Sequence, residues 1–98
     1  MSYCYIIYSE RIDKFYIGAC NGSLESRIEK HNLHSYGNQR YTASTNDWQL
    51  FLSIETVDYS HAIRLENKIK SMKSSIYIRN LKKYSELLQK IYNQTKEK

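Results

Sequence analysis

Residues 3–8 (Tyr-Cys-Tyr-Ile-Ile-Tyr) and residues 14–20 (Lys-Phe-Tyr-Ile-Gly-Ala-Cys) are the stretch that decides the fold. Both runs are rich in β-branched and aromatic residues, which favour strands, and the mostly polar residues between them suit a hairpin loop. Antiparallel pairing across this loop brings Tyr5 and Tyr16 near one another and puts Gly18 on the face of Tyr16. Since Gly18 has no side chain, it leaves room for a phosphate or a close backbone, although a bulge is an equally compatible reading.

A capped helix is expected after the hairpin. Ser23 is a natural N-cap, and Glu25 stands in the first turn, where the helix dipole favours negative charge. Arg27 and His31 are four residues apart and therefore share one helix face. Taken singly, Arg27 is an ordinary surface ion-pair partner and His31 a residue satisfied by the last carbonyls of the helix.

The rest of the chain predicts one more strand and further helices. Alternation from Trp48 to Ile54 marks a third strand with one buried face that includes Leu50, and residues 33–47 read as a loop. Helices are expected from Asp58 or Ser60 to Met72, over residues 76–81 with a start at Ser74 or Ser75, and over residues 84–92, the last packed on the sheet. The predicted fold is a single α/β domain over residues 1–98, with a three-stranded antiparallel sheet flanked by helices.

Glu66 borders the apolar stripe of the second predicted helix. Met72 is the last residue of this stripe, and we expect it in the core. A carboxylate at that margin needs a partner, because its burial alone costs free energy. A divalent cation bridged to a substrate phosphate would provide one. A salt bridge to Lys70, four residues later, is the simpler alternative and contributes only a few tenths of a kcal/mol.

Composition excludes several classes of protein. The chain has 41% apolar residues and no proline, which is typical of a globular domain. Cys4 and Cys20 are expected as buried thiols, because their spacing with His31 and His34 fits no paired zinc-ligand pattern. No apolar run reaches the length of a membrane span and no basic leader is present, so we expect a cytoplasmic protein without a membrane partner.

Charge is unevenly distributed along the chain. Residues 1–60 hold five Lys and Arg against seven Asp and Glu, a balance of −2, whereas residues 61–98 hold ten against three, a balance of +7. A basic half suggests a polyanionic partner, since each phosphate neutralised by Lys or Arg releases counterions. On its own this pattern is also typical of a solvated lysine-rich helix.

Several segments, in matching order along the sequence, resemble the GIY-YIG nuclease family over most of the chain. Tyr5 takes the place of the first motif's tyrosine, and residues 16–18 (Tyr-Ile-Gly) match the second motif. Residues 27–32 resemble the family's helix with arginine and histidine, and residues 62–70 the helix with its metal-binding glutamate. Tyr-Thr at 41–42 and Trp-Gln-Leu at 48–50 resemble stretches of the small stand-alone bacterial members.

This sequence also departs from the family pattern. Tyr3 and Cys4 stand where the first motif has glycine and isoleucine, and Asp47 stands where small members usually have proline. These departures concern the geometry of the first strand more than the reactive side chains.

The resemblance implies a Mg²⁺-dependent endonuclease acting on DNA, with Mn²⁺ as a substitute. It implies a metal ligand in Glu66, phosphate neutralisation by Arg27, and proton transfer involving His31 with Tyr5 or Tyr16, with the choice of tyrosine left open. The DNA contacts that we expect are Gly18, Arg40, Tyr41, Thr42, Lys70 and Asn80.

Two other classes stay open. A non-catalytic nucleic-acid-binding module on the same fold would keep Arg27 and the basic helices without needing Glu66. A structural or protein-interaction domain would have no affinity for DNA even at low salt. The sequence leaves open the DNA structure cut, the pathway (repair, recombination, mobile-element spread or defence) and the oligomeric state, with a monomer slightly favoured.

Overall fold

The two runs that open the chain form the predicted hairpin. In the computed structural model, which describes residues 1–32 and 47–96, a third strand joins them in an antiparallel sheet of order β2-β1-β3. The strands are β1 (Ser2–Ser9), β2 (Lys14–Asn21) and β3 (Gln49–Thr56), and the helices are α1 (Leu24–Asn32), α2 (Tyr59–Met72), α3 (Ser75–Lys83) and α4 (Ser85–Lys96). The predicted α/β class, with a three-stranded antiparallel sheet flanked by helices, is confirmed.

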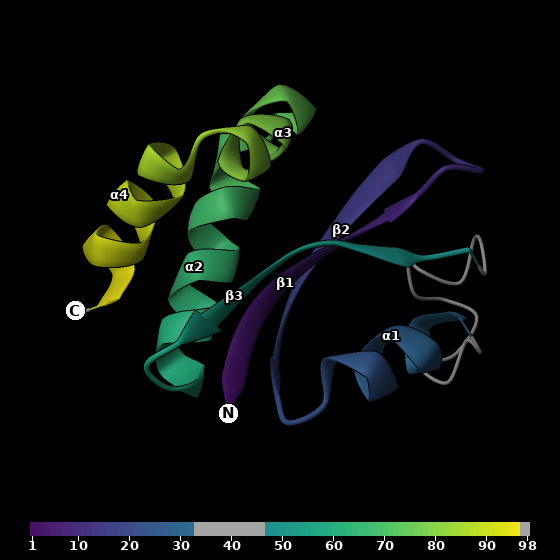
Figure 1. Cartoon of the computed structure of the whole chain (residues 1–98), viewed down its shortest axis with the longest axis horizontal. Coiled ribbons are helices and arrows are strands. Elements are labelled where there is room, and N and C mark those ends of the chain that lie inside the picture. Colours follow the sequence, from purple (N-terminus) through teal and green to yellow (C-terminus); the bar gives the residue numbers. More distant parts are fainter. Residues whose placement is uncertain (33–46, 97–98) are drawn as a thin grey trace.

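The two faces of the sheet carry two separate cores. Alternate residues of β1 divide between them: Cys4 and Ile6 face α2, whereas Tyr5 and Ile7 face α1. Figure 1 shows α1 on one side of the strands and the α2–α4 group on the other. The larger core unites the sheet with α2, α3 and α4 through Cys4, Ile6, Ile17, Ile54, Leu65, Ile69, Ile78, Leu81 and Ile91.

A β-bulge alters the expected face of β3. Ile6 pairs with Leu52 but Ile7 pairs with Leu50, so Phe51 is the extra residue in β3. The shift moves Leu50 out of phase with Leu52, and Leu50 is 47% exposed. The prediction that Leu50 lies on the buried face was therefore wrong, because strict alternation fails at an inserted residue.

Side-chain caps start the helices at the predicted places. The Asp58 carboxylate accepts a hydrogen bond from the His61 amide at 2.8 Å, and the Ser74 hydroxyl accepts one from the Tyr77 amide at 3.2 Å. Ser23 caps α1 in the same way through the Ser26 amide. Of the predicted alternatives, Asp58 and not Ser60 is the N-cap of α2, and Ser74 and not Ser75 is the N-cap of α3.

Two packing predictions for the helices need correction. Met72, expected in the core, is 43% exposed, because α2 ends there and Lys73 takes a left-handed conformation that turns the chain into α3. The last helix, α4, was expected on the sheet but makes most of its contacts with α2 and α3. The face of α2 that holds Ile69 already covers the strands, which leaves its outer side for α4.

A buried histidine joins α2 to α4. His61 is fully buried, and its Nδ1 accepts a hydrogen bond from the Val57 amide at 3.2 Å. The ring proton therefore sits on Nε2, which lies 3.1 Å from Thr95 Oγ1 and 3.3 Å from the Tyr92 carbonyl oxygen. Burial lowers the pKa of His61, because the imidazolium would lose its hydration.

This lowered pKa predicts acid destabilisation. The folded chain holds His61 neutral, so below its ordinary pKa of 6.5 the unfolded chain binds the proton more readily. The free energy of unfolding should fall as pH drops below 6.5 and level off below the pKa of the folded state. Urea unfolding between about pH 5 and 8 measures this. His61→Gln should be less stable at neutral pH but show a weaker pH dependence, and an unchanged dependence would contradict the assignment.

Candidate active site

The Tyr5 side chain fills the space that Gly18 leaves open. Tyr5 of β1 pairs directly with Gly18 of β2, and both residues are buried. A Cβ at position 18 would lie 2.5 Å from Tyr5 Oη and 2.6 Å from Cζ, closer than any real side chain tolerates. Glycine is therefore required here by the phenol, and the room predicted beside Tyr16 is taken largely by Tyr5.

His31 of α1 meets Tyr5 on the same face of the sheet. Its Nε2 lies 2.9 Å from Tyr5 Oη, within hydrogen-bond distance, and its ring is only 4% exposed. The Tyr16 ring also lies near it, with ring centroids 4.9 Å apart. The imidazole thus contacts both tyrosines of the hairpin.

Asn32 fixes the end of α1 that carries His31. Its side-chain amide donates to the Trp48 carbonyl oxygen at 3.0 Å, and its side-chain oxygen accepts from the Trp48 amide at 2.7 Å. This pair of bonds ties α1 to the start of β3, and Trp48 is itself buried beside Tyr5 and Ile7. Sequence reasoning assigned no role to Asn32, although its place directly after His31 was the available signal.

Asp47 provides a second tie to the hairpin. The Ser9 hydroxyl donates a hydrogen bond to Asp47 Oδ1, and the Arg11 amide donates to Asp47 Oδ2 at 3.0 Å. Asp47 thus holds the hairpin loop to the segment that leads into β3. Asp47, which stands where small family members usually have proline, thus has a structural role in this chain.

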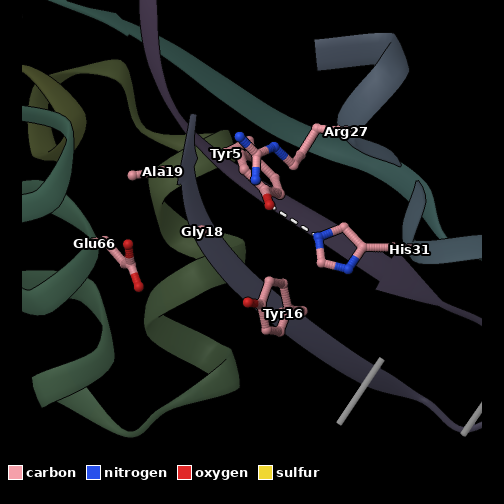
Figure 2. A pocket seen from close by; sticks show the side chains of 7 residues that line it. All are labelled: Tyr5, Tyr16, Gly18, Ala19, Arg27, His31 and Glu66. Atoms are coloured by element: carbon pink, nitrogen blue, oxygen red, sulfur yellow. Dashed lines mark hydrogen bonds between the residues drawn. The ribbon is translucent and has the colours of Figure 1, made fainter. Parts of the chain in front are cut away.

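Glu66 reaches the same pocket from α2. A hollow of about 140 Å³ opens at the edge of the sheet, lined by Tyr5, Tyr16, Gly18, Ala19, Arg27, His31 and Glu66. In Figure 2, Glu66 lies on one side of the β2 ribbon and Arg27 and His31 lie on the other, while Tyr16 is drawn over the ribbon itself. All five predicted catalytic residues therefore line one pocket, although they come from four different elements.

The predicted salt bridge of Glu66 is also present. Lys70 Nζ lies 2.5 Å from Glu66 Oε2, and the Glu66 side chain is only 17% exposed.

Burial and, after it, the Glu66 carboxylate raise the pKa of the Cys4 thiol to about 12. Cys4 and Cys20 are both buried free thiols that belong to the cores on opposite faces, as the reading of inert thiols predicted.

The donor set suits a loosely held hard cation. Among residues 1–32 and 47–96, the structure has no group of three His, Cys, Asp or Glu side chains that could hold a metal ion. Glu66 is the one carboxylate among the residues that line the pocket. Mg²⁺ often binds through one or two carboxylates together with water and substrate phosphates, so Glu66 fits this ion once Lys70 moves aside.

The expected DNA contacts divide into three groups. Gly18 lines the pocket, and Lys70 Nζ lies 5.9 Å from the centroid of the Tyr16 ring. Asn80 lies on α3, away from the pocket lining, and its carbonyl oxygen caps that helix by accepting from the Tyr84 amide. The remaining candidates, Arg40, Tyr41 and Thr42, lie outside the described residues, as does His34.

Comparison with known families identifies this arrangement. The profile of the GIY-YIG catalytic domain matches residues 1–84, and the chain belongs to this family. GIY-YIG proteins are generally nucleases that act on DNA, which gives the class of this protein. No curated protein and no solved structure matches the chain. The part of the chain that the structure describes has no helix long and apolar enough to cross a membrane.

The contact between Tyr5 and Gly18 predicts strong coupling between the two positions. Gly18→Ala should lower the free energy of unfolding by about 1–3 kcal/mol, since the new methyl group collides with the phenol. In a Tyr5→Leu background the same substitution should cost much less, because the ring is gone. Urea unfolding of the four proteins measures the coupling. Equal costs in both backgrounds would show that Gly18 is needed for another reason.

Proposed function

We propose that this chain is a Mg²⁺-dependent endonuclease that hydrolyses phosphodiester bonds of DNA. The observation that supports the proposal is the meeting of two phenols, an imidazole, a guanidinium and a carboxylate in one pocket at the sheet edge. These groups are the ones needed to bind a phosphate, hold a hard cation and move a proton.

Tyr5 and His31 are proposed as the proton-transfer pair. A free phenol has a pKa of about 10 and is a poor base at neutral pH, whereas an imidazole with a pKa of about 6.5 can accept a proton there. The 2.9 Å contact between Tyr5 Oη and His31 Nε2 lets the phenol take a proton from the attacking water as its own proton passes to the ring. Tyr16, which is less buried than Tyr5, orients that water.

Arg27 is proposed to hold the scissile phosphate. Its guanidinium is always charged and its planar fork matches two phosphate oxygens, so it stabilises the negative charge that develops during hydrolysis. Arg27 lies one helical turn before His31, which places phosphate binding and proton transfer on the same face of α1.

Glu66 is proposed to hold the metal ion. When bound, Mg²⁺ supplies positive charge at the scissile phosphate and at the leaving oxygen. A metal ion bound at Glu66 would replace Lys70 as the partner of this carboxylate, and Lys70 would then be available to the substrate. Mn²⁺ prefers the same oxygen ligands and should substitute.

Substrate choice is proposed to follow DNA structure more than sequence. A domain of 98 residues offers few side chains to read base edges, so phosphate contacts should dominate. With one pocket per chain, a single encounter nicks one strand, and a double-strand break needs two copies or two visits. The alternative, a non-catalytic DNA-binding module, would bind without cutting.

Cleavage of a supercoiled plasmid tests the proposal. With Mg²⁺ the native protein should nick the plasmid, and with EDTA it should not. Glu66→Gln should reduce cleavage to the EDTA level, and Arg27→Ala should slow it by about 10²–10³-fold. Glu86→Gln removes an exposed carboxylate in the first turn of α4 and should leave the rate unchanged.

Three results would contradict the proposal. Cleavage that persists in EDTA would show that the reaction needs no metal ion. Native activity in Glu66→Gln would show that Glu66 is not the metal ligand. Binding of plasmid without nicking under all metal conditions would favour the non-catalytic module.

A further inference from the structure

The strand that carries Tyr16 and Gly18 lies at the border of the sheet. In the described part of the chain β2 pairs only with β1, and α2 packs along it. The catalytic pocket opens beside the Gly18 and Ala19 half of this strand. Lys14 and Phe15, at the start of the strand, are not part of that pocket lining.

Basic residues at the C-terminal end of α2 and just beyond it follow this border away from the pocket. Glu66 lies at the pocket with Gly18, Lys70 lies over the Tyr16 ring, and Lys73 lies near Lys14. Later residues of α2 thus meet earlier residues of β2, so the two elements run antiparallel. Four residues of strand, from Gly18 back to Lys14, span about 13 Å.

A second, wider hollow lies at the far end of this path. Its volume is about 440 Å³, and its lining includes Lys14, Phe15, Lys73 and Ser74. Both lysines are exposed, and Lys73 is set in place by its left-handed backbone, with φ of 48°, at the end of α2. Continuity along β2 connects this hollow to the catalytic pocket.

The charge of this hollow is positive on balance. The carboxylate of Asp13 also lines it, but Asp13 accepts a hydrogen bond from Tyr8 Oη at 2.5 Å and has the Arg79 guanidinium 3.8 Å away. The Arg79 guanidinium therefore offsets part of the Asp13 charge. Lys14 and Lys73 have no carboxylate bonded to them among the salt bridges of the described residues.

We propose that this border of β2 is the path of the cleaved DNA strand, with Lys70, Lys14 and Lys73 binding its phosphates beyond the scissile one. The inference rests on the proposed nuclease function and adds where the substrate lies. With a rise of about 3.4 Å per nucleotide, the 13 Å path takes about four nucleotides on one side of the cut. Phosphate contacts of this kind position the strand without reading its sequence.

The salt dependence of DNA binding tests this path. The double variant Lys14→Gln/Lys73→Asn removes both charges of the second hollow, and asparagine tolerates the left-handed backbone at position 73. Lys90→Gln/Lys96→Gln removes the same charge from α4 and serves as the matched control. Binding of a labelled DNA duplex is followed by fluorescence anisotropy in EDTA, between about 50 and 200 mM salt.

The slope of log K against log salt should become less steep by about 1.8 in the Lys14/Lys73 variant, because two phosphate contacts are lost. The control should keep the native slope, and urea midpoints should show that both variants fold. An unchanged slope, or an equal change in the control, would overturn the path.

Failure of the path and failure of the nuclease proposal give different results. Metal-dependent nicking with an unaltered slope would reject the path alone. An altered slope without nicking would reject the nuclease proposal alone. No binding by the native protein even at low salt would contradict both.

Discussion

The close approach of the Tyr5 phenol to the backbone of Gly18 is the contact on which the rest of the site depends. It lets the ring lie flat over the neighbouring strand, so that its hydroxyl reaches His31 Nε2 at 2.9 Å. Any side chain at position 18 would push the phenol away from that bond. In this chain the glycine of the second motif is therefore required for a steric reason.

The pocket is built where the two cores of the molecule meet. Tyr5, Tyr16 and His31 belong to the face covered by α1, whereas Glu66 comes from α2 on the opposite face and reaches the pocket past the edge strand β2. An edge strand is usually a liability because its backbone is unpaired. Here it allows side chains from both faces to line one pocket. In the proposed function that pocket binds the scissile phosphate, and the border of β2 carries the DNA strand beyond it.

Periodicity and capping chemistry predicted the strands and the helix starts, because these depend on neighbours in the sequence. What they missed depends on packing. A bulge places Leu50 on a different face from the one predicted, and Met72, the last residue of α2, lies outside the core. The hydrogen bonds from Asn32 to Trp48 and from the hairpin to Asp47 join residues that are far apart in sequence. A local sequence pattern therefore does not predict them. The convergence of Glu66 with the tyrosines was predicted from the family resemblance, since spacing alone gave only a helix face.

Anomalous diffraction at the manganese edge would test the central claim most directly, with crystals of the cleavage-impaired Arg27→Ala protein bound to Mn²⁺ and a short DNA duplex. The account predicts a manganese peak at the Glu66 carboxylate and a DNA phosphate between that ion and the hydroxyls of Tyr5 and Tyr16. A manganese peak away from Glu66, or DNA bound with no phosphate in this pocket, would contradict it.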